Sequence, residues 1–334
     1  MLIDGRIAAA AAVFCTSLLL TGIETQAQAI PKEVAARVEI HTIPTLTLPD
    51  RQFLAGDTNG SQPVAVAGEL KIAQGIGRLP AVVLMHGSGG ISPTMEAWTR
   101  QLNSLGISTF VIDGFSGRGL TSVNQDQAKL GRLNFVLDLY GALDILAKHP
   151  RVDPERIVLM GFSRGGQGAL YASLKRFHET WNRSGAQFAG YIAFYPDCAT
   201  TYAGDTDVVD RPIRIFHGTP DDYNPVATCK AYVARLQEEK RDVTLTEYPD
   251  SQHGFDAGLL GVSSNVVAAG AQTVRSCRIK ESEGGVLINA ETNEPFSYKD
   301  ACVETGPHVG GNPATAEEAC KAVNEFLRTL FKLG

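Results

Sequence analysis

The chain has 334 residues, of which 44% are hydrophobic and 20% are charged. This balance is typical of a globular protein with a large core, and it excludes a disordered chain. The formal net charge is -6 and no cluster of Lys and Arg occurs, which argues against nucleic acids and anionic membrane surfaces as partners. No C-x-x-C or H-E-x-x-H spacing occurs either, so we expect neither a metal ion nor another cofactor. The oligomeric state stays open.

Residues 1–29 differ from the rest of the chain and have the pattern of an export signal. The stretch from Ile7 to Ile23 is nearly free of polar groups, and Ala27-Gln28-Ala29 then offers the small residues of a cleavage site. We expect a signal peptide over residues 1–29 and a mature protein that is periplasmic or secreted. An uncleaved anchor is the alternative, although the apolar run is slightly short for a membrane span.

Five cysteines remain beyond the predicted cleavage site. In an oxidising compartment this odd number predicts one or two disulfides and one leftover thiol. Cys198 closes a predicted strand and Cys229 begins a predicted helix, while Cys277 and Cys302 bracket a loop-rich stretch. We predict the pairs Cys198–Cys229 and Cys277–Cys302, although spacing alone does not determine the connectivity.

Strands and helices alternate along most of the chain. Apolar runs predict strands over residues 64–72, 81–85, 107–112, 157–160, 190–195, 212–216 and 243–248. Helical patterns follow at 94–105, at 128–148 and directly after Ser163. This alternation indicates an α/β fold with a mainly parallel central sheet. The domain boundaries that we expect are an extended N-terminal segment at 30–62, a single domain at 63–334, and within it an insertion at 262–312 that either covers the site or lies at its rim.

The four apolar residues at 157–160 lead into Gly161-x-Ser163-x-Gly165. A serine on a sharp turn between a buried strand and a helix has a strained backbone, so the positions two before and two after it must be almost free of side-chain atoms. The turn lifts the hydroxyl away from the sheet, and the first N–H groups of the helix point to where negative charge develops in acyl transfer. Ser163 is therefore the candidate nucleophile. The alternative is a Gly-rich turn that only lets a helix pack close to the sheet.

A second Gly-rich loop, His86-Gly87-Ser88-Gly89-Gly90, follows an earlier predicted strand. It does not fit a phosphate-binding loop, because no Gly-Lys-Ser/Thr follows. An acyl-transfer oxyanion needs one N–H donor from the residue after the nucleophile and one from a neighbouring strand-end loop. We assign these donors of the oxyanion hole to Arg164 and Ser88, with Gly87 and Gly89 as alternatives for the second.

A serine hydroxyl needs an imidazole to accept its proton and a carboxylate to orient that imidazole. In a strand-turn-serine architecture the acid and then the histidine follow the serine in the chain. His253 comes shortly after the last predicted strand and precedes a glycine, so we prefer it as the base. His308, in a Gly/Pro-rich stretch, is the alternative. His217 lies within the strand end that we expect to deliver the acid.

Two neighbouring carboxylates, Asp221 and Asp222, follow the strand predicted over residues 212–216. Either of them can instead cap the helix that we expect directly afterwards, which is a common role of Asp. We assign the cap to Asp222 and the catalytic acid to Asp221. Asp197, which follows the preceding strand, is the fallback for the acid.

Some residues are candidates for contact with substrate because of their place in the sheet. Ligands bind at the carboxyl ends of strands in open parallel sheets, and Phe115 and Arg118 follow the strand at 107–112. Arg118 either contacts a substrate carboxylate or fixes its own loop. Further aromatic candidates for the pocket wall, each of which also suits the core, are Phe162, Tyr223, Trp98 and Phe255.

Together these motifs resemble the dienelactone hydrolase family of α/β-hydrolases over nearly all of residues 63–334. The segments that carry the resemblance are Gly161-Phe162-Ser163-Arg164-Gly165-Gly166, His217-Gly218-x-x-Asp221-Asp222-x-x-Pro225, Tyr248-Pro249-x-x-x-His253-Gly254-Phe255-Asp256 and Asp113-x-Phe115-x-x-Arg118-Gly119. The resemblance implies an α/β-hydrolase fold, with helices on both faces of the sheet. It also places the nucleophile, acid and base on Ser163, Asp221 and His253.

The chain also departs from the family pattern at two positions. The enzymes that give the family its name use a cysteine nucleophile and a glutamate in the oxyanion loop, where this sequence has Ser163 and Gly87. We therefore expect a serine carboxylesterase that hydrolyses a small-molecule ester or lactone through an acyl-enzyme, with a substrate other than dienelactone. A peptidase or thioesterase on the same scaffold, or a non-catalytic binding protein of the same fold, is the alternative.

Overall fold

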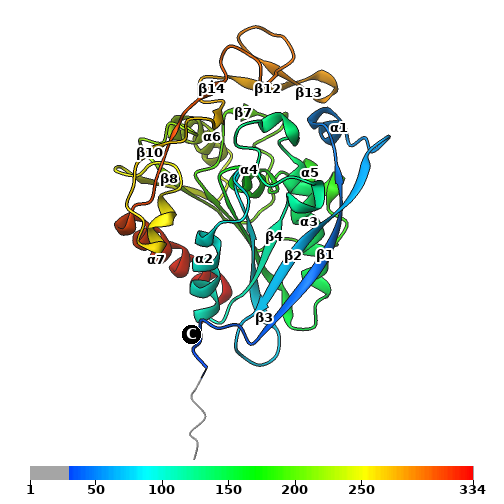
Figure 1. Cartoon of the computed structure of the whole chain (residues 1–334). Coiled ribbons are helices and arrows are strands. Elements are labelled where there is room, and N and C mark those ends of the chain that lie inside the picture. The colour runs from blue at the N-terminus through cyan, green and yellow to red at the C-terminus, as the bar shows by residue number, and fades with distance from the viewer. Residues whose placement is uncertain (1–29, 334) are drawn as a thin grey trace, which may run out of the picture. The chain divides into compact units, whose positions relative to one another are not determined.

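An eight-stranded sheet forms the centre of the protein in a computed structural model that describes residues 30–333 (Figure 1). The strand order is β1-β2-β4-β3-β5-β6-β8-β9. The β1–β2 and β2–β4 pairs are antiparallel and the other five pairs are parallel, which confirms the mainly parallel sheet. These strands are β1 (Arg37–Thr47), β2 (Gln62–Ile72), β3 (Leu79–Met85), β4 (Ser108–Asp113), β5 (Val152–Phe162), β6 (Gly190–Phe194), β8 (Ile213–Gly218) and β9 (Val243–Tyr248).

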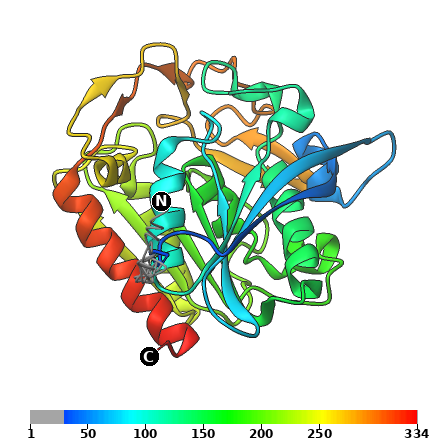
Figure 2. The same cartoon turned by 60° about the horizontal axis from the view of Figure 1, so that its bottom comes forward.

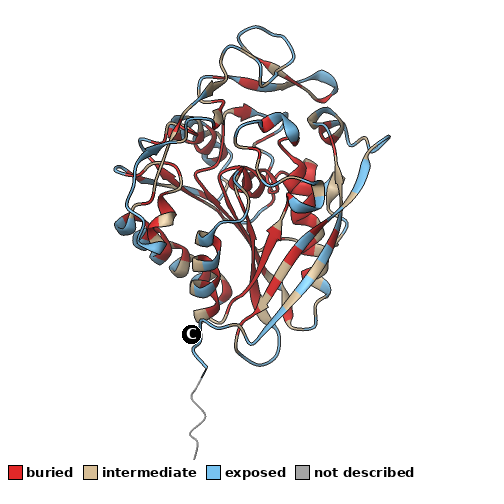
Figure 3. Cartoon of the chain, viewed as in Figure 1, coloured by how far each residue is buried: buried red, intermediate tan, exposed pale blue. Residues whose placement is uncertain are grey.

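Helices cover both faces of this sheet, as predicted (Figure 2). Successive residues of a strand point to opposite faces. In β3, Val83 and Met85 join the core under α1, α3, α4, α5 and α6, whereas Val82 and Leu84 join the core under α2 and α7. The central strands are therefore buried along their length (Figure 3). The helices are α1 (Asp50–Ala55), α2 (Pro93–Ser104), α3 (Asn134–Lys148), α4 (Arg164–Tyr171), α5 (Lys175–Trp181), α6 (Val226–Glu238) and α7 (Pro313–Phe331).

The segment at 30–62 is not separate from the rest of the protein, which corrects the predicted boundary. Its strand β1 pairs with β2 along its whole length, and its helix α1 buries Phe53 in the core. Pro44 fits β1 because this is an edge strand, where a missing backbone donor is tolerated. The sequence did not indicate a strand, because β1 is exposed or half-buried at most positions and so lacks a clear apolar alternation.

The helix predicted over residues 128–148 begins later, at Asn134. Before it, Gln127–Lys129 form a short 3₁₀ turn. The Asn134 side chain accepts a hydrogen bond from the backbone N–H of Leu48 and donates one to its carbonyl, both at 2.8 Å. This pairing with a distant loop holds residues 130–133 outside the helix, a tertiary contact that local helix propensity does not reveal.

The residues predicted as an insertion, 262–312, form small sheets joined by loops. The strands β10 and β15 pair, β11 and β14 pair, and β12 lies between β13 and β7. Disulfides join Cys198 to Cys229 and Cys277 to Cys302, as predicted, and Cys320 is a buried free thiol. The short strands are β7 (Thr200–Thr201), β10 (Val266–Val267), β11 (Gln272–Thr273), β12 (Ile279–Ser282), β13 (Val286–Asn289), β14 (Glu304–Thr305) and β15 (His308–Val309).

Two predictions concern membranes. The signal peptide predicted over residues 1–29 lies outside the described residues. Among the helices found between residues 30 and 333, none combines the length and the apolar character needed to cross a bilayer.

Candidate active site

Ser163 lies on a sharp turn between β5 and α4, with backbone angles φ 55° and ψ −116°. A Cβ atom at Gly161 would lie 2.0 Å from the carbonyl oxygen of Gly165, and one at Gly165 would lie 2.2 Å from that of Met85. No side chain fits at either position, so the two flanking glycines are sterically required. The turn therefore has the tight form that the Gly-x-Ser-x-Gly spacing predicts.

The hydroxyl of Ser163 meets an imidazole and a carboxylate from two other strand ends. Nε2 of His253 lies 2.8 Å from Oγ of Ser163, and Nδ1 of His253 lies 2.8 Å from Oδ2 of Asp221. His253 follows β9 and Asp221 follows β8, so the parallel strands bring these residues to one edge of the sheet. All three side chains are buried.

Asp221 is held by the backbone as well as by the histidine. Its Oδ1 accepts hydrogen bonds from the N–H groups of Tyr223, at 2.8 Å, and Asn224, at 2.9 Å. With Oδ1 occupied by two donors, Oδ2 is the oxygen that faces His253. This geometry stabilises the carboxylate and fixes which nitrogen of the imidazole carries the proton, because only a protonated Nδ1 can donate to Oδ2.

Two tyrosine rings enclose the His253 imidazole. The ring of Tyr223 stacks on it with centroids 4.6 Å apart, and the ring of Tyr195 lies at 4.5 Å in a tilted arrangement. Tyr195 donates a hydrogen bond of 2.5 Å to Asp256, which also accepts one of 2.9 Å from the Trp98 indole. Burial raises the pKa of the Asp256 carboxyl. Tyr195 was not among the predicted site residues, although it directly follows β6 and a position after a strand end is the signal that indicated other site residues.

The loop that carries the Ser88 N–H approaches Ser163, since a Cβ atom at Gly87 would lie 3.7 Å from Oγ of Ser163, and the Arg164 N–H follows Ser163 directly in the chain. Within residues 30–333, neither the Ser88 nor the Arg164 N–H has a hydrogen-bond acceptor. His86 fixes the loop, since its Nδ1 lies 2.7 Å from the carbonyl oxygen of Gly87 and its Nε2 accepts from the N–H of Gly114 at 3.1 Å. Burial lowers the pKa of His86, so the imidazole is neutral at pH 7 and has one donor and one acceptor nitrogen for these two bonds.

His308, the alternative base, forms a hydrogen bond with Asp222, the other carboxylate considered for the acid. Nδ1 of His308 lies 2.9 Å from Oδ2 of Asp222, which also pairs with Arg275. Asp222 does not cap α6, which corrects that prediction, because its carboxylate is engaged by these two partners. The fallback acid, Asp197, pairs with Arg132.

Another histidine downstream of Ser163, His217, is fully buried. Its Nδ1 bonds to the carbonyl oxygen of Gly218 at 3.0 Å and lies 3.9 Å from Oδ2 of Asp221. It therefore packs behind the carboxylate, and among the downstream histidines it is His253 that contacts the Ser163 hydroxyl.

A model of the dienelactone hydrolase family matches residues 66–275. The chain belongs to this family. A provisionally named carboxymethylenebutenolidase from Synechocystis sp. is 22% identical over 207 residues, which cover 58% of this chain and 83% of the relative.

Two solved structures share the fold of this dienelactone hydrolase family member. One is a dienelactone hydrolase-like promiscuous phosphotriesterase from metagenomic libraries, with a TM-score of 0.53 and 16% identity over 87% of this chain and 98% of that one. The other, named m3DLH, has a TM-score of 0.55 and 18% identity over 88% of this chain and 98% of that one. The expected α/β-hydrolase fold is thereby confirmed.

Two residues proposed for contact with substrate instead belong to the core of this family member. Arg118 donates to both carboxylate oxygens of Asp138, at 2.7 and 2.8 Å, and to the carbonyl oxygen of Gly114. The ring of Phe115 is 1% exposed and packs against His86. The prediction that Phe115 and Arg118 line the site is wrong, because the loop after β4 turns its side chains inward. Of the two roles considered for Arg118, the structure supports fixation of the loop.

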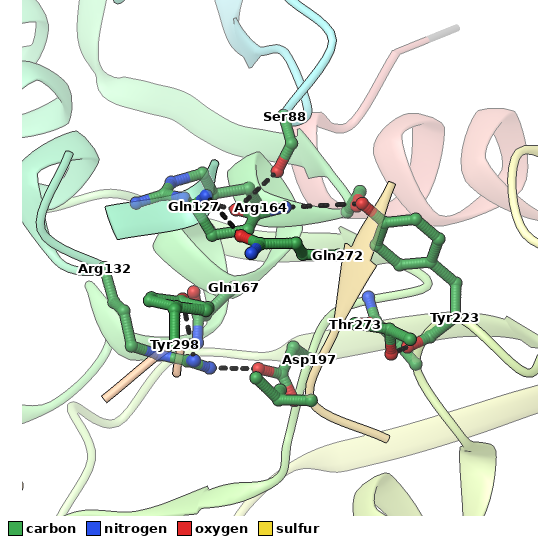
Figure 4. Close-up of a pocket in the computed structure, with 13 residues that line it drawn as sticks. Ser88, Gln127, Arg132, Arg164, Gln167, Asp197, Tyr223, Gln272, Thr273 and Tyr298 are labelled. Carbon is green, nitrogen blue, oxygen red and sulfur yellow. Dashed lines mark hydrogen bonds and ion pairs between the residues drawn. The ribbon is translucent and has the colours of Figure 1, made fainter. Parts of the chain in front are cut away.

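Ser163 lies at the wall of two cavities. The larger, of about 390 Å³, is lined by Phe162, Tyr223, His253 and mostly apolar neighbours. The smaller, of about 30 Å³, is polar and lies on the side of Arg132 and Arg164 (Figure 4). Phe162 and Tyr223 line the larger cavity, whereas Phe255 is in the core. Of the residues that line the small cavity, Gln127, Arg132, Gln167 and Gln272 belong to no motif, so the sequence did not single them out.

One other group in the described residues has the composition of a metal site. Glu39, His41 and His149 lie close together, with Glu39 Oε2 at 3.1 and 3.2 Å from the two Nε2 atoms. However, Nδ1 of His149 accepts from the N–H of Arg151, so Nε2 carries the proton of the neutral ring and donates to Glu39. Arg37 also pairs with Glu39. Hydrogen bonding therefore accounts for this cluster.

Proposed function

We propose that this chain is an exported serine hydrolase that cleaves carboxylic esters or lactones with Ser163, His253 and Asp221 as nucleophile, base and acid. The observation that carries the proposal is the placement of the His253 imidazole at 2.8 Å from both the Ser163 hydroxyl and the Asp221 carboxylate. A serine without such a base is a weak nucleophile at neutral pH. Membership in the dienelactone hydrolase family supports the hydrolase function independently.

The proposed reaction proceeds in two stages. Nε2 of His253 takes the Ser163 proton as Oγ attacks the carbonyl carbon, and the N–H groups of Ser88 and Arg164 bind the resulting oxyanion. The imidazolium then gives its proton to the leaving alkoxide, which departs as the alcohol and leaves an ester on Ser163. Water, deprotonated by the same imidazole, attacks this ester, and the acid and the free hydroxyl are released.

The substrate class follows from the site and from the relatives. The larger cavity is mostly apolar and suits an uncharged organic ester. The name of the Synechocystis relative refers to a butenolide, which is a lactone. Because Ser163 and Gly87 stand where the enzymes that give the family its name have cysteine and glutamate, we place simple esters and lactones before dienelactone.

Export is part of the same proposal. Two disulfides between Cys198 and Cys229 and between Cys277 and Cys302 support it, because disulfides persist mainly in oxidising compartments. N-terminal sequencing of the protein recovered outside the cytoplasm tests the signal peptide, with Ile30 as the expected first residue. A protein that remains cytoplasmic with its Met1 retained would contradict this part of the proposal.

The catalytic assignment is tested by labelling with a fluorophosphonate and by hydrolysis of p-nitrophenyl acetate. The wild-type protein should be labelled, and Ser163→Ala should lose both the label and the turnover. Ser92→Ala is the matched control, because Ser92 lines the same cavity and has no histidine partner among residues 30–333. This variant should keep the label. Labelling that survives in Ser163→Ala would refute the proposal.

A further inference from the structure

The two cavities at Ser163 differ in whether they reach His253. The larger cavity is lined by Ser163, Ser88, Tyr223 and His253. The smaller one is also lined by Ser163, Ser88 and Tyr223, but His253 is not part of its wall. Tyr223 stacks on the imidazole and borders both cavities, so its ring lies between His253 and the small cavity.

Given the function proposed above, this difference indicates which cavity holds the alcohol part of an ester and which holds the acyl part. The tetrahedral carbon carries Oγ of Ser163, the oxyanion, the leaving oxygen and the acyl substituent. The leaving oxygen must lie within hydrogen-bond reach of Nε2 of His253, which has to protonate it. The alcohol therefore belongs in the larger cavity, and the acyl substituent points toward the smaller one.

We propose that the small cavity is an acyl site that accepts only a short acyl group and prefers one that carries a hydrogen-bond acceptor. This inference rests on the proposed function and adds to it the class of substrate: short, oxygenated acyl esters of larger apolar alcohols. The size limit and the preference for an acceptor follow from two separate observations.

The size limit follows from the volume. The small cavity holds about 30 Å³, and one water-sized group needs roughly 10 to 15 Å³ measured in the same way. About two or three non-hydrogen atoms beyond the carbonyl carbon fit into it. Acetyl, glycolyl and methoxyacetyl groups fit into this space, whereas a hexanoyl chain is too long for it.

The preference for an acceptor follows from unpaired donors in the cavity wall. Nε of Arg132, Nε of Arg164 and Nε2 of Gln167 are buried and have no hydrogen-bond partner in the described structure. All three residues line the small cavity, and each is less than 10% exposed. Buried donors without acceptors are unfavourable. An oxygen in the acyl group would satisfy one of them, which an alkyl chain of the same shape does not.

The guanidinium groups themselves are held in place, so the unpaired donors are positioned in advance. Arg132 bonds through its two terminal nitrogens to Tyr298 and Asp197 (Figure 4). Arg164 bonds to Oε1 of Gln127 at 2.6 Å and to backbone carbonyls. Because the terminal nitrogens are occupied, Nε is the nitrogen of each guanidinium that remains without a partner in the described structure.

The test compares esters of one alcohol, p-nitrophenol, on the purified wild-type protein. Methoxyacetyl and butyryl groups have nearly the same shape, and only the former carries an acceptor oxygen in the chain. Each kcat/KM is divided by the rate constant for hydroxide hydrolysis of the same ester. This corrected kcat/KM should be at least about tenfold higher for the methoxyacetate than for the butyrate. The corrected kcat/KM should also be at least about tenfold higher for the acetate than for the hexanoate.

Variants of the two cavities provide matched controls. Gln167→Leu removes an unpaired donor and should bring the methoxyacetyl-to-butyryl ratio toward one. Val274→Ala widens the small cavity and should raise the rate on butyrate relative to acetate. Met95→Ala alters the larger cavity, so it should change the preference among alcohols and leave the acyl profile as in wild type. Circular dichroism and the melting temperature show whether each variant is folded.

The outcomes separate this inference from the function on which it rests. Hydrolysis that becomes faster from acetate to hexanoate, or equal corrected rates for methoxyacetate and butyrate, would overturn the acyl-site assignment while the esterase function stands. A wild-type protein that shows neither a Ser163-dependent label nor any ester turnover would refute the function itself, and the assignment would fall with it. The wild-type profile decides the question even where a variant does not fold.

Discussion

The hydrogen bonds of Asp221 lead to a specific prediction for Asp221→Asn. In the wild-type protein, Oδ1 accepts from the N–H groups of Tyr223 and Asn224, and Oδ2 accepts from His253. An asparagine must keep its oxygen toward the two backbone donors, because its NH₂ group cannot accept from them. The NH₂ group then faces Nδ1 of His253. The imidazole is forced into the tautomer that carries its proton on Nε2, and this tautomer cannot accept the proton of Ser163.

The expected loss is large because the wrong tautomer removes the base without removing its side chain. A change of this kind in a Ser-His-Asp triad lowers kcat by about 10⁴-fold, which corresponds to about 5.4 kcal/mol of activation free energy. The fold should persist, since both backbone hydrogen bonds are retained. The assay is the hydrolysis of p-nitrophenyl acetate at pH 7, together with the melting temperature to show that the variant is folded.

Asp222→Asn is the matched control, because this neighbouring carboxylate pairs with His308 and Arg275 and not with His253. We expect its kcat to stay within about threefold of the wild-type value, since no contact with the imidazole changes. The argument about the tautomer is refuted if Asp221→Asn keeps more than a tenth of the wild-type kcat while its melting temperature is unchanged. It is also refuted if Asp222→Asn loses as much activity as Asp221→Asn.

Three further predictions concern stability, measured as the free energy of unfolding in urea. Gly165→Ala places a Cβ atom 2.2 Å from a carbonyl oxygen and should cost about 3 kcal/mol or more, whereas Gly168→Ala, whose nearest contact is 3.3 Å, should change stability by about 1 kcal/mol at most. Removal of the Cys198–Cys229 disulfide, with a sequence separation of 31, should cost about 3 to 4 kcal/mol, and an unchanged value would contradict its formation. Burial lowers the pKa of His217, so below pH 6.5 the unfolded chain binds a proton that the folded chain does not. Stability should therefore fall on acidification by at most about 1.4 kcal/mol per pH unit from this residue, and His217→Asn should reduce that slope.

The part of the site that could be predicted from the sequence is the part set by local sterics and chain order. Gly161 and Gly165 are required by contacts within a few residues of Ser163, so the motif itself carries the information. The order of serine, acid and histidine follows from successive parallel strands, which end at one edge of the sheet. This reasoning led to Asp221 and His253, and in the structure His253 lies at hydrogen-bond distance from both Ser163 and Asp221.

The errors come from loops, where a side chain can turn either way. Phe115 and Arg118 follow β4 at the same edge of the sheet, but Arg118 turns inward to a buried carboxylate on α3. That carboxylate, Asp138, lies on a helix whose pattern alone does not show that a charge is buried. Conversely, Tyr195 follows β6 and packs on His253, whereas the sequence predicted it only as the last residue of the strand at 190–195.

The small cavity shows why substrate preference is harder to derive from the sequence than the triad. Hydrogen bonds between residues far apart in the sequence hold its wall in place. Gln272 accepts a hydrogen bond from the N–H of Gln127 at 2.9 Å, and Thr273 donates one of 2.6 Å to the carbonyl oxygen of Tyr223. These two residues belong to the segment at 262–312, so a change in that segment alters the cavity without touching the hydroxyl, imidazole or carboxylate. Under the proposed function, the strand ends carry the groups that attack the carbonyl, and the segment at 262–312 supplies part of the wall around the acyl group.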